Sequence, residues 1–113
     1  MYQQLFTRLA LSGTTLSEVS QPVAMQGANS AQFDVVVISL SGTGTPTVTC
    51  QLQESNDLEN WKDKGSATAP TAVGYTLAAA QTGISSGYVR LKVTLSGTTP
   101  ITVVSAGINT SAQ

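Results

Sequence analysis

The chain has no histidine and only one cysteine, Cys50, among its 113 residues. Without histidine, neither a Ser-His-Asp triad nor a histidine-ligated zinc site can be assembled, and one cysteine cannot form a disulfide within the chain. Cys50 lies in an alternating run of apolar and polar residues with no basic neighbour, so we predict an ordinary strand position rather than a reactive thiol. We therefore predict no catalytic residue, no metal site and no cofactor.

Charged side chains are also scarce, with five basic and six acidic residues, 10% of the chain, and a formal net charge of −1. Soluble proteins usually carry about 25% charged residues. Binding to nucleic acid needs a stripe of basic residues that this composition does not supply, so we expect no nucleic-acid partner. A neutral polar surface has little repulsion between copies, which suits a closely packed assembly.

Long hydrophobic runs are missing as well. No stretch approaches the ~20 apolar residues of a membrane-spanning helix, so we expect no membrane partner. Near the N-terminus the apolar run from Leu9 to Leu11 is too short for a signal peptide, and Arg8 interrupts the apolar stretch. We expect a protein made in the cytoplasm without a signal peptide.

The chain is instead rich in Thr, Val, Ser and Gly, which favour strands and turns over helix interiors. Short alternating segments separated by turn signals predict an all-β fold for residues 1–113: a single antiparallel β-sandwich or jelly-roll-like domain of about seven to eight short strands. Residues 77–81 could form one helical turn at most, and residues 1–16 are a possible N-terminal arm or exchanged strand. The predicted strands are 4–11, 17–26, 32–40, 47–54, 59–63, 72–78, 87–95 and 101–109.

The sequence contains two similar segments, and we call this similarity the echo. The segment from Phe33 to Leu52 is followed, in register, by a similar segment from Tyr88 to Ile108. Each contains an alternating strand that ends in Leu-Ser-Gly-Thr, a short turn containing proline, and a second β-branched strand. The echo predicts two similar hairpins, with Pro46 and Pro100 each at the start of the returning strand.

The two copies differ in polarity. The later one is amphipathic, with Arg90 and Lys92 opposite its apolar side, whereas the earlier one is apolar on both sides. Aligning the copies places Val36, Ile38 and Leu40 at core positions. The opposite face then needs a cover, from the N-terminal segment or from another subunit. The candidate contacts with another subunit or a shell are Phe33, Val35 and Val37, together with Tyr2, Leu5 and Phe6 of the N-terminal segment.

The segment from Glu54 to Lys64 holds six of the eleven charged residues and the only tryptophan. Its carboxylates could ligate Ca²⁺, but their spacing does not match an EF-hand loop. We prefer a tight turn in which Ser55, Asn56 and Asp57 bond to their own backbone and Trp61 folds back over the edge of the domain. Asn56, Asp57 and Trp61 are the candidate surface-binding loop. A sugar could also bind on exposed aromatic residues, for which Tyr2, Trp61, Tyr75 and Tyr88 are available.

Two stretches, QLQESNDLENWKD and SGYVRLKVTLSGTTPITV, resemble a pattern found in small β-sandwich virion proteins of tailed bacteriophages, of the capsid decoration or cement type. The pattern comprises Ser55, Asn56, Asp57 and Trp61, followed by a strand that begins Tyr-Val-Arg at Tyr88. Leu58-Glu59 stand where a glycine is common. The resemblance covers the C-terminal two-thirds of the chain, and it implies a non-enzymatic structural role and often a trimer.

The leading hypothesis is a capsid decoration protein that oligomerises, with a trimer favoured, contacts the major capsid protein and resides in the virion. The rival is a carbohydrate-binding or adhesive surface module. A third alternative is a subunit of a tail tube or an extracellular filament.

Overall fold

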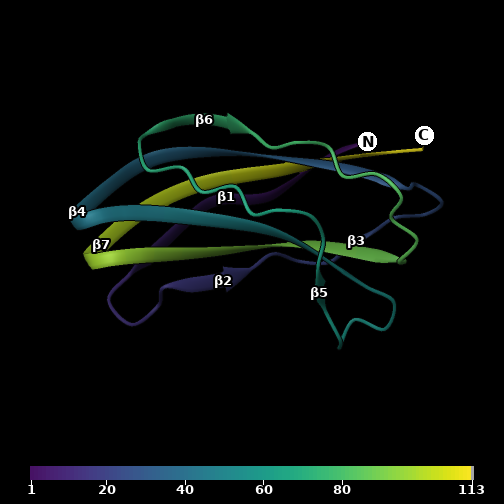
Figure 1. Cartoon of the computed structure of the whole chain (residues 1–113), viewed down its shortest axis with the longest axis horizontal. Coiled ribbons are helices and arrows are strands. Elements are labelled where there is room, and N and C mark those ends of the chain that lie inside the picture. The colour runs from purple at the N-terminus through teal and green to yellow at the C-terminus, as the bar shows by residue number, and fades with distance from the viewer. Residues whose placement is uncertain (113) are drawn as a thin grey trace.

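The computed structural model describes residues 1–112 and is all-β, with seven strands and no helix among these residues (Figure 1). This confirms the predicted fold class, although two of the strands are long. The residues predicted as a possible helical turn, 77–81, belong instead to the end of a strand and the loop after it. The strands are β1 (Tyr2–Ser12), β2 (Ser17–Val19), β3 (Val23–Ala24), β4 (Ser30–Ser55), β5 (Lys62–Asp63), β6 (Gly74–Leu77) and β7 (Tyr88–Ser111).

The two long strands, β4 and β7, form the frame of the molecule. They pair antiparallel from Ser30 opposite Ser111 to Ser55 opposite Tyr88, and both bend back at the same end of the molecule (Figure 1). Each long strand therefore runs through both layers of a sandwich. The first layer contains β1, β6 and the halves 30–41 and 101–111 of the long strands; the second contains β2, β3, β5 and the halves 47–55 and 88–96.

The predicted hairpins are wrong, because the two similar segments pair with each other along their length. Their Leu-Ser-Gly-Thr stretches form a shared corner. Gly42 and Gly97 have φ angles of 131° and 132°, which favour glycine. A Cβ on Gly42 would lie 2.9 Å from the Cα of Pro100, and one on Gly97 would lie 3.1 Å from the Cα of Pro46. The echo is thus the signature of two strands that cross one corner together.

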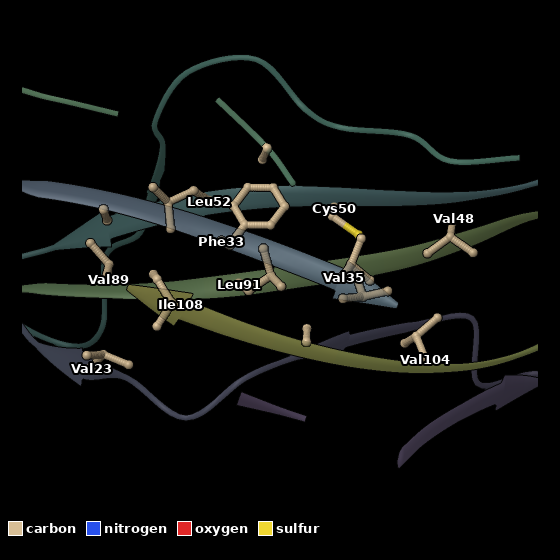
Figure 2. Packing of buried hydrophobic residues seen from close by; sticks show 14 of the residues in the cluster. Val23, Phe33, Val35, Val48, Cys50, Leu52, Val89, Leu91, Val104 and Ile108 are labelled. Atoms are coloured by element: carbon tan, nitrogen blue, oxygen red, sulfur yellow. The ribbon is translucent and has the colours of Figure 1, made fainter. Parts of the chain in front are cut away.

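The core lies between the two layers. Phe33 and Val35 point into it from the first layer toward Leu52 and Leu91 of the second (Figure 2), and Val37 belongs to the same buried cluster. They are at most 3% exposed. Their cover is therefore the second layer of the same chain, not an added N-terminal layer or another subunit. These three side chains are unavailable as subunit or shell contacts.

The assignment of the faces of β4 from the aligned echo was inverted. Val36 and Ile38, predicted to be core residues, are each 38% exposed. The pairing register shifts between Val37 and Ser39, which makes Ile38 an extra residue in the strand. This irregularity returns Leu40 to the core side, where it packs against buried residues. A bulge of this kind changes which alternate residues face inward, and alternation alone does not reveal it.

The N-terminal strand β1 pairs with β7 of the same chain, at the edge of the first layer. Leu5 and Phe6 are half-buried against the core, whereas Tyr2 is 57% exposed. A register shift between Gln4 and Phe6 allows two consecutive residues to approach the core. None of the described residues forms a helix that could cross a membrane.

Candidate functional site

The outward side of the first layer, here called the outer face, carries exposed apolar side chains. Val36 lies directly opposite Tyr75 of β6 and Ser105 of β7, so the three share this face. Ile38 and Ile101 continue it toward the corner, and Ile101 is 53% exposed. Single exposed apolar residues are ordinary, whereas contiguous exposed apolar patches are typical of interaction sites.

The other end of the outer face holds a cluster that we call the tyrosine cluster, made of Tyr2, Asp34, Tyr75 and Gly107. The hydroxyl of Tyr2 donates to Oδ1 of Asp34 and the hydroxyl of Tyr75 donates to Oδ2, both at 3.1 Å. Partial desolvation raises the pKa of both phenols, and the hydrogen bond and negative charge of Asp34 raise it further. One carboxylate therefore holds two aromatic rings.

Gly107 makes this arrangement possible. It lies on β7 directly between Asp34 and Gln4, in the path of the Tyr2 side chain. A Cβ at this position would overlap the hydroxyl and the ring of Tyr2. Its backbone does not require glycine, since its φ is not among the positive values. Glycine in a strand interior costs about 0.5–1 kcal/mol relative to alanine, so this position sacrifices stability to admit the ring.

The outward side of the second layer is organised differently. The guanidinium of Arg90 lies 4.2 Å from the ring centroid of Trp61, and its Nε donates to Oε1 of Gln53 at 2.8 Å. Nε2 of Gln53 in turn donates to Oδ1 of Asp63 at 3.0 Å. Trp61 also donates its indole N–H to the carbonyl of Leu58. The polar groups here are bonded to one another.

The candidate loop is held by its own hydrogen bonds. Asp57 accepts the backbone N–H groups of Asn60 and Glu59 at 2.8 and 3.0 Å, and these bonds, with the Asn60 and Ser55 side chains, hold its pKa well below the usual range. Oγ of Ser55 accepts the N–H groups of Asp57 and Leu58 at 3.2 and 3.0 Å, so Ser55 and Asp57 hold the turn as predicted. Oδ1 of Asn56 instead accepts the N–H of Gly87 at 3.0 Å, so the prediction that Asn56 bonds to its own local backbone was wrong. Within residues 1–112, no three His, Cys, Asp or Glu side chains gather as metal ligands.

Cys50 occupies the ordinary strand position predicted for it. Its side chain is fully buried between the layers, and burial raises the pKa of the thiol to about 12. A thiol with such a pKa remains protonated and unreactive at neutral pH.

Two hollows are lined by residues outside the tyrosine cluster. The larger, of about 450 Å³, is lined mainly by small and apolar residues that include Met1, Val23 and Met25. The smaller, of about 310 Å³, is lined by residues that include Phe33 and Lys64. Of the candidate residues predicted from the sequence, only Phe33 lines either of them. Tyr2 and Tyr75, two of the four aromatic residues considered for a sugar, belong to the tyrosine cluster.

Comparison with known proteins gives a fold and no family. No protein-family model matches the chain, and no curated protein matches it. Among solved structures, the PBSX exported protein XepA is 16% identical with a TM-score of 0.76, over 100% of this chain and 37% of XepA. The chain thus spans little more than a third of that protein.

Two further structures share the fold at lower similarity. A chain of the Broad Bean Stain Virus structure is 11% identical with a TM-score of 0.53, covering 98% of this chain and 86% of its own. The CBM36-1 domain of a multidomain xylanase from the hindgut metagenome of Trinervitermes trinervoides is 9% identical with a TM-score of 0.57, covering 100% and 98%. At these identities the likeness establishes the fold alone.

Proposed function

We propose that this protein is a non-enzymatic structural protein of a phage-type virion, a capsid decoration protein that oligomerises and stabilises the head shell. The observation that carries the proposal is the exposed apolar row on the outer face, formed by Val36, Ile38 and Ile101. Phe33, Val35 and Val37 are buried in the core. The proposed contact residues are instead the exposed residues between and beyond them.

The outer face has the properties of a surface that packs against protein. It is built on regular strands, which hold the apolar side chains in fixed positions and reduce the entropy lost on binding. With 10% charged residues in the whole chain, little repulsion opposes the approach of another copy. We favour a trimer whose copies contact each other through this row and jointly contact the major capsid protein.

A decoration protein of this size would bind the shell strongly because many modest contacts act together. Each copy makes modest contacts with the shell, and linkage within an oligomer raises the effective concentration of the remaining contacts. The fold shared with a chain of the Broad Bean Stain Virus structure supports the proposal, because it places the same architecture in a virus. The part shared with XepA leaves more than half of that protein unmatched, so XepA supports only the idea of a module.

The test adds the same charge to two exposed aliphatic positions on opposite sides of the molecule. Ile38→Glu places a carboxylate in the apolar row, and Val19→Glu is the matched control on β2, where Val19 is 37% exposed and lies opposite Lys92. Light scattering should show an oligomer for the wild type and for Val19→Glu, and a monomer for Ile38→Glu. Cosedimentation with shells of a major capsid protein should follow the same order.

A wild type that stays monomeric at micromolar concentration and does not sediment with shells would refute the proposal. Equal loss of the oligomer in both variants would place the contact elsewhere. Electron microscopy of the same samples would reveal filaments or tubes, the outcome expected for a tail-tube subunit.

A further inference from the structure

The tyrosine cluster holds two exposed aromatic rings in fixed positions by hydrogen bonds to one carboxylate. Its two rings come from opposite edges of the first layer, β1 and β6, and are 57% and 61% exposed. Both oxygens of Asp34 are engaged, one by each phenol, so neither ring is free to turn away without losing a bond to a charged acceptor. Two aromatic surfaces are thereby held in place while most of their area stays in water.

Stability does not account for this arrangement. A hydrogen bond between exposed side chains contributes little to folding, and apolar ring surface left in water contributes nothing. Gly107 supports the same conclusion. A residue with a side chain at this position would strengthen β7 but would displace the ring of Tyr2. A chain that keeps a weaker strand in order to seat an exposed ring is arranged for binding.

We propose that the tyrosine cluster binds a neutral glycan. The C–H groups of a sugar ring would pack against the faces of Tyr2 and Tyr75, and sugar hydroxyls would exchange hydrogen bonds with the phenols and with Asp34. Gln4 and Ser105, joined by a hydrogen bond of 2.9 Å beside the cluster, add further polar groups at its margin. This binding role goes beyond assembly and uses a different part of the outer face from Ile38 and Ile101.

The chemistry of the cluster separates a glycan from other ligands. Its one charged group is a carboxylate, which repels phosphate and so disfavours nucleotides and nucleic acids. A quaternary ammonium ion is best held by rings that surround it, whereas Tyr2 lies against the sheet at Gly107. The arrangement is an open platform that fits the flat apolar side of a sugar.

The test is a titration of the full chain, labelled with ¹⁵N, with cellohexaose and separately with hexa-N-acetylchitohexaose, up to about 10 mM because single-platform sites are weak. Amide signals near residues 2, 34, 75 and 107 should shift. Tyr75→Ala should weaken binding about tenfold or more through loss of stacking. Gly107→Ala, which displaces the other ring, should weaken it similarly.

The control is Val73→Ala, which removes a side chain of similar exposure (62%) next to the end of β6 that lies farther from Asp34, and should leave binding unchanged. Near-native spectra for each variant show that it is folded. No shift with either hexasaccharide, equal binding by Tyr75→Ala, or shifts with tetramethylammonium in place of sugar would overturn the proposal. Because Ile38→Glu tests assembly and Tyr75→Ala tests glycan binding, either idea can fail alone.

Discussion

The outward sides of the two layers use the same pair of strands for different purposes. On the second layer, Arg90 covers Trp61 and joins Gln53, so polar and aromatic groups satisfy each other within the chain. On the first layer, Val36 and Ile38 face water with no such cover. Because both sides come from β4 and β7, the difference does not reflect architecture. It comes from the side chains that each half of the two strands carries.

The strongest test of the difference between the inward and outward sides of β4 is to replace either of two neighbouring residues with lysine. Val37→Lys buries a charge in a position with 0% exposure and should abolish folding, at a cost above about 4 kcal/mol. Val36→Lys points outward and should change the free energy of unfolding by about 0.5 kcal/mol or less. Circular dichroism with urea denaturation measures both. If Val37→Lys remained as stable as Val36→Lys, the faces of β4 would be assigned wrongly.

The corner that joins the two layers offers the next largest effect. Gly42→Ala and Gly97→Ala would each add backbone strain and a clash with the opposite proline, and should cost about 1–3 kcal/mol. Gly74→Ala is the control, since its φ of 143° is similar but nothing lies within 4 Å of the added Cβ. Thermal unfolding should rank both corner variants below Gly74→Ala. The same midpoint for all three would mean that the contact with proline adds nothing.

A smaller effect on stability is expected on the outward side of the second layer, where Arg90 covers Trp61. Arg90→Ala removes the contact with Trp61 and the hydrogen bond to Gln53, and should cost about 1 kcal/mol. Lys92→Ala, which removes a cation from the same strand and face, serves as the control and should be nearly neutral. Trp61 fluorescence should change only in the first variant. Equal changes in both variants would show a general effect of charge.

The effect of Cys50, between the layers, is absent at neutral pH and appears only at high pH. Its thiol has a pKa raised from about 9.0 to about 12 by burial, so the unfolded state ionises first as the pH rises. The contribution of the neutral thiol to stability is complete below pH 9 and is lost between pH 9 and about 12. Wild type should therefore lose stability relative to Cys50→Ala in that window, and a thiol reagent should not label the native protein at neutral pH. A parallel pH dependence in both proteins would mean that the thiol is not desolvated.

Much of the fold follows from local patterns. Alternation and turn signals predicted the strands and the all-β class because each depends on residues close together in the chain. The prediction of two hairpins was wrong because the Leu-Ser-Gly-Thr stretches resemble hairpin turns locally, while the actual partner of each segment lies far along the chain. The bulge at Ile38 is likewise invisible to alternation, and it inverted the face assignment.

The tyrosine cluster was missed for a related reason. Tyr2, Asp34 and Tyr75 come from three strands that only the sheet order brings together. One signal was present: Asp34 is the only charged residue in the apolar run from Phe33 to Leu40. A carboxylate at such a position needs partners, but the sequence does not name them. Gly107, inside a strand and without a turn beside it, was a second signal of close approach.

The folded ribbon of β4 and β7 also sets the order in which the chain can find its structure. The sequence separation of paired residues grows from Ser55 and Tyr88, which are connected by the segment that contains β5 and β6, to Ser30 and Ser111 at the far end. Pairing that starts at Ser55 and Tyr88 closes the smallest entropic gap first, and each later pair extends it. The long-range contacts place refolding on the millisecond-to-second scale. In this order of pairing, the corner at Gly42 and Gly97 would form before the first layer.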